Sequence, residues 1–519
     1  MTKRVTLQQL VDNFNEAATN DDSANMLQLA RQLLERDPAN PDFMALVLQA
    51  LDSAGRITED IGFIQRYVLA KSTDVLGFML LSRAYIRCDR PFEALLSLTF
   101  ALSVDPDNTD CQQLLKTLLA QISPEYTHVR LNVMTTNRIG HLASEIEPWA
   151  RAVDDHEKGC FYIFVAPSDE APANTYLYQL LRQVARIVES DFFYHLYVSR
   201  PLLLTDDSYA PYPYDLPSRF RGVSNLDIST KGLENLRRIY RDYPPCLTIS
   251  AEDKKLGWEH LDSFGISASD KLVCLHVRDS AYLKRKFPNQ DWSYHNYRDA
   301  KITTYKESIE YLIDQGYKVI RIGAETDQKL DLISSSYLDF CANRSSAHGD
   351  FIELFLLSEC VFFIGNYGGP YGVAPLFDTP TLVVNGAPVQ VTYPKHCHLI
   401  PKLLFKDDEL VSMVDIINGK RLSGDASIPI ASCFSGDDLN RHGYKYRDNS
   451  SADIIRAVSE FEQRIGNGFF DSRPSDIQLA FRDAVSNNAS SPITMNLICS
   501  SFLNDHPDAF RGMQITDRN

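Results

Sequence analysis

The apolar residues between about positions 6 and 122 recur every three or four residues, which is the spacing of one helix face. Two clear stretches run from Met26 to Leu34 and from Ala94 to Leu102. Side chains at that spacing lie on one side of a helix and can be buried together. We therefore expect residues 1–122 to form an all-helical domain.

This helical region also repeats itself. Pro38 and Pro106, each preceded by Asp, are separated by about two periods of the roughly 34-residue tetratricopeptide repeat. Between them, the segment from Ala84 to Leu95, followed by Ala101-Leu102, resembles the tetratricopeptide repeat family. Such a repeat implies a surface for a protein partner or for self-association. A helical hairpin array without a ligand groove is the alternative.

After Pro124 the pattern changes to short apolar runs that alternate with helical stretches. The predicted strands are 127–134, 161–166, 272–277, 318–322, 360–364 and 381–384, and the predicted helices are 176–189, 303–315, 350–358 and 451–465. Continuous apolar runs are typical of parallel strands that are covered on both faces. The fold class expected is therefore α/β, with a pair of doubly wound Rossmann-type domains that face each other across a cleft.

These changes of pattern divide the chain into four expected parts. They are a helical repeat at 1–122, a first Rossmann-like domain at 123–250, a second at 251–420, and a helical or irregular extension at 421–519 that packs back on the domains before it. Within the first α/β part, residues 200–245 are rich in Pro, Tyr, Asp and Arg, and we expect irregular chain there.

Composition narrows the class of protein. The formal net charge of −16 argues against binding to nucleic acid, because a surface that contacts many phosphates needs clustered Lys and Arg. The ten cysteines are scattered singly, as expected for reduced thiols in a cytoplasmic protein. Neither a secretory leader nor a transmembrane run is expected from the apolar stretches.

Two predicted strands end on residues that could contact an anion. Arg138, Gly140 and His141 follow the first strand, where a glycine lets backbone N–H groups approach a ligand. His276 and Arg278 end the strand at 272–277, and an arginine fork there matches a diphosphate. Strand alternation puts these two side chains on one face, so a core role for His276 is the alternative.

A glycine-rich loop follows the strand at 360–364. It contains Asn366, Gly368 and Gly369, whose backbone N–H groups could cradle phosphate oxygens, although a turn without a ligand is the alternative. Its spacing is neither that of a dinucleotide-binding loop nor that of a P-loop. Three further candidate ligand-binding residues at strand ends are Gly323, Glu325 and Asn385. Because parallel strands share one carboxyl edge, we expect these groups to converge.

No metal or other cofactor is expected. The only compact group of potential ligands is His396-Cys397-His398, and its spacing is not that of a zinc site. No Asp-x-Asp motif follows a strand to hold a metal-bound diphosphate.

Residues 126–404 resemble an uncharacterised bacterial group of glycosyltransferases of the surface-carbohydrate type. The segments that carry the resemblance are Arg138 to His141, His276 to Asp279, Tyr297-Arg298 to Tyr305, Gly316 to Gly323, and Phe363-Ile364-Gly365 through Asn385. More distantly, the His-x-Arg strand end is similar to that of the fucosyltransferase superfamily, which has the two-domain GT-B fold. In that superfamily the matching arginine, here Arg278, holds the donor pyrophosphate without metal.

The resemblance implies transfer of a hexosyl or fucosyl group from a nucleotide diphosphate sugar to a hydroxyl of a glycan or protein acceptor. The domain at 123–250 would bind the acceptor and the domain at 251–420 the donor. Arg278 and the backbone at 368–369 would stabilise the leaving diphosphate. The candidates for the general base are His141, Glu145, Asp169 and Glu170.

The sequence departs from the family pattern at one place, because Asn366-Tyr367-Gly368-Gly369 stands where serine is usual. The loss of a hydroxyl there implies that a backbone N–H makes the phosphate contact instead, or that the donor substrate is a different one. Two other functions stay open. One is a nucleotide-sugar epimerase or hydrolase of the same fold, and the other is an interaction protein whose transferase-like domain is inactive.

Overall fold

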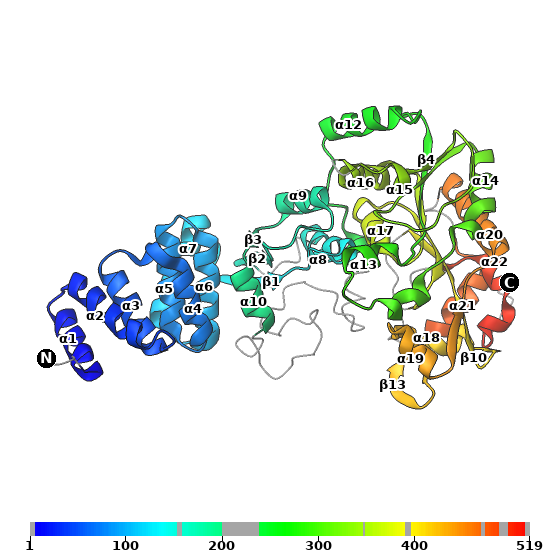
Figure 1. The fold of residues 1–519 in the computed structure, drawn as a ribbon. Coiled ribbons are helices and arrows are strands. Elements are labelled where there is room, and N and C mark those ends of the chain that lie inside the picture. The colour runs from blue at the N-terminus through cyan, green and yellow to red at the C-terminus, as the bar shows by residue number, and fades with distance from the viewer. Residues whose placement is uncertain are drawn as a thin grey trace. The chain divides into compact units, whose positions relative to one another are not determined.

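The computed structural model describes residues 6–152, 158–199, 238–345, 348–389, 396–468, 473–486 and 497–513. Most of the irregular chain expected at 200–245 lies outside these residues. The chain divides into two compact units (Figure 1). The first comprises Met1–Met134, Asp154–Glu170 and Ala185–Ser224, and the second comprises Thr135–Val153, Ala171–Val184 and Asn225–Asn519. The two units interleave along the chain and do not correspond one to one with the four expected parts. The expected domain boundaries therefore remain predictions.

The first unit begins with antiparallel helical hairpins, as predicted. Their helices are α1 (Leu7–Thr19), α2 (Ser23–Arg36), α3 (Pro41–Ser53), α4 (Ile61–Ala70), α5 (Val75–Arg87), α6 (Pro91–Val104) and α7 (Thr109–Ile122). The breakers predicted from the sequence sit between helices: Asn40 caps α3 through its side chain, and Asn108 caps α7. Such caps satisfy backbone N–H groups that the first helical turn leaves unpaired.

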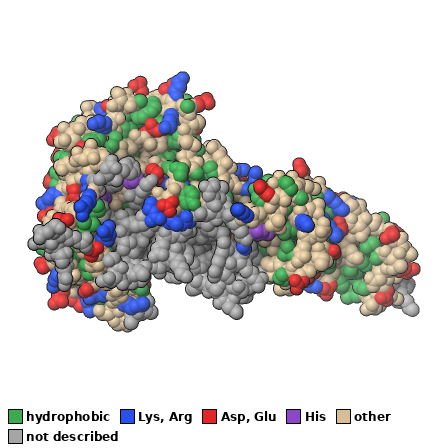
Figure 2. Space-filling model, turned by 180° about the vertical axis from the view of Figure 1, so that it is seen from behind, with side chains coloured by type: hydrophobic (Ala, Val, Ile, Leu, Met, Phe, Trp, Pro, Cys, Tyr) green, Lys and Arg blue, Asp and Glu red, His purple; other side chains and the backbone are tan. Residues whose placement is uncertain are grey.

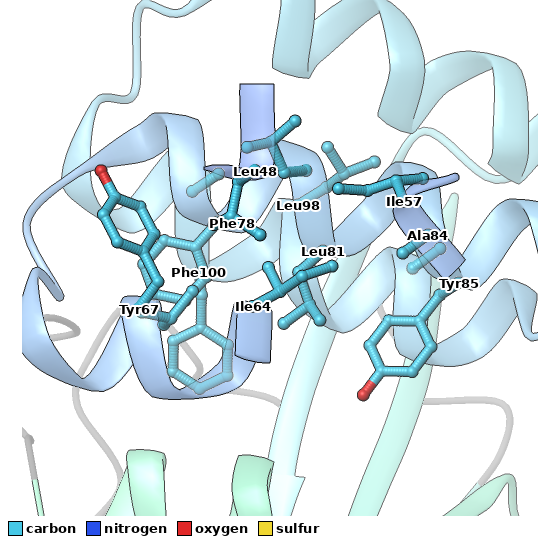
Figure 3. Packing of buried hydrophobic residues seen from close by; sticks show 14 of the residues in the cluster. Leu48, Ile57, Ile64, Tyr67, Phe78, Leu81, Ala84, Tyr85, Leu98 and Phe100 are labelled. Atoms are coloured by element: carbon cyan, nitrogen blue, oxygen red, sulfur yellow. The ribbon is translucent and has the colours of Figure 1, made fainter. Parts of the chain in front are cut away.

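The hairpins are held together by an apolar core (Figure 3). Phe78 of α5 and Phe100 of α6 are fully buried and stack with ring centroids 5.9 Å apart. Small residues such as Ala84 and Ala101 are also fully buried in the same core. The helical spacing of the sequence is thus explained by packing of one helix face on its neighbours.

The same core continues into a three-stranded parallel sheet. Its strands β1 (His128–Val133), β2 (Cys160–Ala166) and β3 (Ile187–Glu189) lie in the order β1-β2-β3. Phe193, in α10 (Asp191–Ser199), stacks on Phe100 at 6.0 Å. The predicted helix at 176–189 is wrong at its end, because α9 (Thr175–Val184) stops and the β-branched pair Ile187-Val188 joins β2.

The second unit contains, within the described residues, a seven-stranded sheet whose pairs are all parallel. Its order is β15-β9-β8-β7-β4-β5-β6, and the bounds are β4 (Lys271–His276), β5 (Tyr317–Arg321), β6 (Tyr337–Asp339), β7 (Phe362–Gly365), β8 (Thr381–Gly386), β9 (Cys397–Pro401) and β15 (Leu497–Ile498). The chain runs outward from β4 to β6, returns, and runs the other way from β7. The winding direction therefore reverses between β4 and β7.

Helices flank this sheet and hold its loops. They include α8 (Ile139–Arg151), α9, α12 (Ala251–Asp262), α13 (Ala281–Lys286), α14 (Lys306–Asp314), α16 (Gly349–Glu359), α17 (Gly369–Val373), α20 (Ser451–Gly466), α21 (Asp476–Ser486) and α22 (Ser500–Asp505). The sequence did not indicate β9, whose residues looked like a possible ligand cluster, nor β15 near the chain end. β9 lies between β8 and β15 and pairs with both, whereas β15 is a two-residue strand at the edge of the sheet. Both depend on pairing with their neighbours.

The predicted fold class, helical repeats followed by parallel α/β structure, is confirmed. None of the helices in the described part of the chain is both long and apolar enough to cross a membrane. On the face shown in Figure 2, acidic and basic side chains are interspersed.

Candidate functional site

A cavity of about 280 Å³ opens at the point where the winding of the large sheet reverses. Its lining comes from the ends of three strands, from the start of α8, and from helices, turns and loops beside them. The lining residues used below are Arg138, His141, His276, Arg278, Asp279, Arg298, Arg344, Glu353 and the loop from Tyr367 to Gly372. Open parallel sheets bind ligands at this reversal, since adjacent loops there diverge and leave a crevice.

Arg278 extends β4 into the cavity and is almost fully buried. Its backbone N–H donates to Asn366 Oδ1 at 2.8 Å, and its guanidinium donates to the carbonyl of His295 at 3.3 Å. The guanidinium also forms an ion pair with Asp299. Burial, together with nearby Arg298, lowers the pKa of Arg278 to about 9, so the side chain stays charged at neutral pH.

Two other arginines of the lining differ from Arg278. Arg138 lies over the ring of Trp292, with its guanidinium carbon 4.9 Å from the ring centroid. Arg298 has a buried Nε without a hydrogen-bond partner among the described residues. Neither arginine forms an ion pair with any residue in the described part of the chain. The cavity therefore gathers positive charge that its own carboxylates do not fully neutralise.

The histidines near these arginines are neutral. His276 shares a hydrogen bond of 3.1 Å between its Nδ1 and the carbonyl of Ile322, and burial lowers its pKa to about 4. Because a carbonyl only accepts, Nδ1 carries the proton and Nε2 is left as an acceptor. Burial, with Arg298 and Arg138 close by, lowers the pKa of His295 to about 3. Neither imidazole adds positive charge at neutral pH.

The glycines of the loop are required by close packing. A Cβ on Gly369 would lie 2.2 Å from Cγ2 of Ile139, and one on Gly368 would lie 2.8 Å from Nε2 of His276. A Cβ on Gly372 would lie 3.4 Å from the Cα of Gly140, which is about ordinary contact distance. The first turn of α8 can therefore lie directly against α17, which places Arg138 and His141 beside the loop.

The other predicted donor-binding residues divide into two groups. Gly323 and Glu325 line the cavity, and Glu325 forms an ion pair with the exposed Arg285. Asn366 and Asn385 are fully buried and are not among the lining residues. Asn366 donates to the carbonyl of Arg298 at 2.9 Å and so ties that segment to the end of β7.

Asn385 serves the framework of the second unit. Its backbone N–H donates to Asn449 Oδ1 at 2.7 Å, and its own Oδ1 accepts the N–H of Asn449 at 2.6 Å. Its φ of +57° is a conformation that asparagine tolerates better than most residues. Its side-chain amide donates to the hydroxyl of Tyr305 at 3.1 Å.

Two buried or half-buried carboxylates also line the cavity. Glu353 accepts the backbone N–H of Gly323 at 3.1 Å and pairs with Arg344 at 3.4 Å, while burial raises its pKa. Asp279 accepts the hydroxyl of Thr326 at 2.6 Å and two backbone N–H groups, and these bonds hold its pKa below the ordinary value in spite of burial. The cavity is thus lined by both cationic and anionic side chains.

Of the candidate bases, only His141 is among the lining residues. Glu145 belongs to α8, but its side chain lies outside the described part of the structure. Asp169 and Glu170 belong to the first unit. Their roles stay predictions.

The described residues contain one group with metal-ligand chemistry, His398, Glu460 and Cys499. Both oxygens of Glu460 accept backbone N–H groups, from Ser500 and Ser501, each at 2.8 Å. Arg464 lies 3.4 Å from His398 Nε2. A guanidinium in that place disfavours a cation, and the carboxylate has a structural role in capping α22.

Comparison with known proteins gives likenesses of fold. No family model matches the chain, and no curated protein does. Among solved structures, the MamA protein resembles 23% of this chain over 64% of its own length, at 16% identity and a TM-score of 0.22. The E. coli ADP-heptose LPS heptosyltransferase II resembles 64% of this chain over 99% of its own, at 12% identity and a TM-score of 0.35.

A third solved structure is a family 9 glycosyltransferase from Veillonella parvula. It resembles 52% of this chain over 85% of its own length, at 13% identity and a TM-score of 0.33. The Arabidopsis OM64 TPR domain is also similar, to 22% of this chain. Parts of this chain are thus similar to solved structures of helical repeats and of glycosyltransferases. These are the two kinds of protein that the sequence motifs resemble.

Sequence reasoning missed several groups that form the cavity. Arg298 stands in a 3₁₀ segment, Glu353 in α16, and Arg344 in the chain before α16, where no strand end marks them. Arg298 stands in a short 3₁₀ segment, Ser293–Arg298, that has no periodic pattern. Arg298 does belong to the segment Tyr297-Arg298 to Tyr305 that carries the family resemblance, but the resemblance assigned it no role in the site.

Proposed function

We propose that this chain is a glycosyltransferase that transfers a sugar from a nucleotide diphosphate sugar to an acceptor hydroxyl, without a metal ion. We further propose that the enzyme is cytoplasmic and that its two α/β domains have the GT-B arrangement. Its role would lie in bacterial surface-carbohydrate synthesis or in protein glycosylation. The single observation that carries the proposal is the cluster of arginines in a cavity at the reversal point of a parallel sheet.

The chemistry of the cavity supports a diphosphate ligand. Guanidinium groups bind phosphate oxygens in pairs, and burial strengthens such hydrogen bonds because the surrounding dielectric is low. A leaving nucleoside diphosphate gains negative charge as the glycosidic bond breaks. Fixed positive groups that stabilise this charge would lower the barrier without any metal.

Other groups of the cavity fit a sugar beside the diphosphate. His276 has a free acceptor at Nε2, and Asp279 and Glu353 are acceptors as well. Sugar hydroxyls are donors that such groups bind. His141 is the proposed general base, because it alone of the described base candidates is among the lining residues.

The first test is thermal unfolding of the full chain with a panel of nucleoside diphosphates and their sugars, with a chelator present. A ligand that binds only the folded state raises the transition temperature. We expect one nucleobase to give a clear shift. Absence of any shift contradicts the proposal and favours an interaction protein with an inactive domain.

The second test separates transfer from other chemistry. The stabilising nucleotide sugar is incubated with a bacterial glycan fraction, and nucleoside diphosphate release is measured with and without that acceptor. Release that requires the acceptor supports transfer. Donor turnover at the same rate without acceptor would favour an epimerase or hydrolase.

A further inference from the structure

Within the proposed function, on which this inference rests, we propose that Arg138 and Arg298 are the two residues that bind the diphosphate directly. The sequence pattern favours Arg278 as the diphosphate ligand. In this proposal Arg278 lies beside the diphosphate, and its charge is already neutralised by Asp299. The ligand class that follows is a diphosphate with two negative charges, as in a nucleotide diphosphate sugar.

The pairing of the cavity arginines carries this assignment. Arg278 pairs with Asp299, and Arg344 pairs with Asp350 and Glu353. In the described part of the chain, no carboxylate pairs with Arg138 or Arg298. A charge in a partly buried site without a counter-ion is costly, and an anionic ligand removes that cost.

Arg298 also has an unmet hydrogen-bond donor. Its Nε is buried and has no hydrogen-bond partner among the described residues. A buried donor without a partner costs free energy, whereas the Nε and terminal nitrogens of one guanidinium together match two oxygens of a phosphate. A phosphate at this side chain would supply the missing acceptor.

Both arginines are held by the framework around them. The carbonyl of Arg298 accepts from Asn366, which also accepts from the N–H of Arg278. Arg138 is stacked on Trp292, and the carbonyl of Asn137 just before it accepts from Lys286 at 2.8 Å. Their backbones are therefore fixed before a ligand arrives, which reduces the entropy lost on binding.

Charge balance identifies the ligand class. Two arginines without counter-ions match the two negative charges of a diphosphate that links a nucleoside to a sugar. A nucleoside monophosphate sugar carries one charge on its phosphate and would leave one arginine unpaired. We therefore expect monophosphate sugars to bind more weakly than the diphosphate sugar of the same base.

The test is calorimetric titration of the full chain with inorganic pyrophosphate and with nucleoside diphosphates. The variants are Arg298→Gln, Arg138→Gln, Arg298→Lys and the double variant Arg278→Gln/Asp299→Asn, which removes a neutral pair. Arg241→Gln is the matched control, because Arg241 is exposed and, among the described residues, forms an ion pair with its neighbour Asp242 alone. Circular dichroism and thermal unfolding confirm that each variant is folded.

We expect Arg298→Gln and Arg138→Gln each to weaken binding by about tenfold to a hundredfold, as for the loss of a charged hydrogen bond. Arg298→Lys should recover only part of the affinity, because lysine lacks the planar fork. The double variant should lose less affinity than either single glutamine variant. Binding by Arg298→Gln that equals wild type, or a larger loss in the double variant, overturns the assignment.

The two proposals can fail separately. Pyrophosphate binding that Arg298→Gln abolishes, without binding of any nucleotide, would keep the assignment and contradict the proposed function. Nucleotide binding that depends on Arg278 but not on Arg298 would support the proposed function and overturn the assignment of Arg138 and Arg298. If neither probe binds, both are overturned.

Discussion

The interiors of the two units differ in kind. In the described part of the first unit, the buried polar side chains are only Ser82, Ser97 and Asn132. All buried charged side chains among the described residues belong to the second unit: Glu147, Arg151, Arg278, Arg321, Glu353, Lys402 and Asp453. The first unit is held by apolar burial, while the second keeps charges inside where they are costly unless paired.

The buried charges of the second unit are themselves of two kinds. Arg321 donates to Asp339, Thr326 and the carbonyl of Gln328, so its charge is fully satisfied. Lys402 is likewise held by Asp448 and two carbonyls. Arg298 is only partly buried as a residue, but its Nε is buried and has no hydrogen-bond partner among the described residues. Satisfied charges fix the fold, and unsatisfied ones indicate where a ligand belongs.

The largest effect is expected from breaking a buried ion pair of the second unit. Arg151 and Glu147 are both fully buried, and Arg151 also pairs with Asp378 at 2.9 Å. Arg151→Met leaves an uncompensated carboxylate, so we expect a loss of about 3–5 kcal/mol of unfolding free energy in urea denaturation. The double variant Glu147→Leu/Arg151→Met should recover most of it, and a double variant as unstable as the single one would contradict this account.

The first unit should respond to loss of volume instead. Phe100 is fully buried between Phe78 and Phe193. Phe100→Ala should cost about 3–5 kcal/mol by cavity formation, measured by the same urea denaturation. Ile122→Ala is the control, because Ile122 is exposed at the end of α7. A cost below about 1 kcal/mol for Phe100→Ala would mean that the repeat does not depend on this core.

A smaller effect is expected where α8 meets the glycine loop. Gly369→Ala brings a methyl group against Ile139, and overpacking of this kind costs about 1–3 kcal/mol. Ile139→Ala in the same chain should restore stability. Gly466→Ala at the end of α20 is the control, since a Cβ there meets nothing within 4 Å. Equal stability of Gly369→Ala and wild type would show that α8 and α17 are not closely packed.

The last effect is negligible at neutral pH and grows with acid. Burial lowers the pKa of His398 to about 3, while an unfolded histidine titrates near about 6.5. The unfolded chain therefore binds more protons below that pH, and stability falls with acidification from about pH 6.5 toward about pH 3. His398→Gln should flatten this slope by on the order of 1 kcal/mol per pH unit. An unchanged slope would mean that another group causes the acid sensitivity. No histidine of the repeat at 1–122 could be that group, because this segment contains none.

Much of the fold could be predicted because local pattern and burial agree. Helices in 1–122 follow from helical spacing and side-chain caps such as Asn40 and Asn108. The central strands β4, β5, β7 and β8 are continuous apolar runs and lie together in the sheet. Strands β3, β9 and β15 were missed, because short strands depend on the strands that they pair with more than on their own residues.

Part of the site could be predicted for the same reason. Strand ends marked His276, Arg278 and Gly323, and the structure places all three on the cavity. Asn385 also ends a strand, yet its hydrogen bonds to Asn449 use it in the framework. Arg298 was missed, because nothing in its local pattern shows that Asn366, far along the chain, fixes its backbone.

The sequence by itself determined the periodic elements, the fold class and the arginine at the end of β4, since each depends on residues close together in the chain. The tertiary structure alone decided which arginines keep a carboxylate partner. Ion pairing is a property of distances between segments: Asp299 neutralises Arg278 and leaves Arg298 without a counter-ion among the described residues. Residue type gives the charge, and only the fold determines whether that charge is already neutralised.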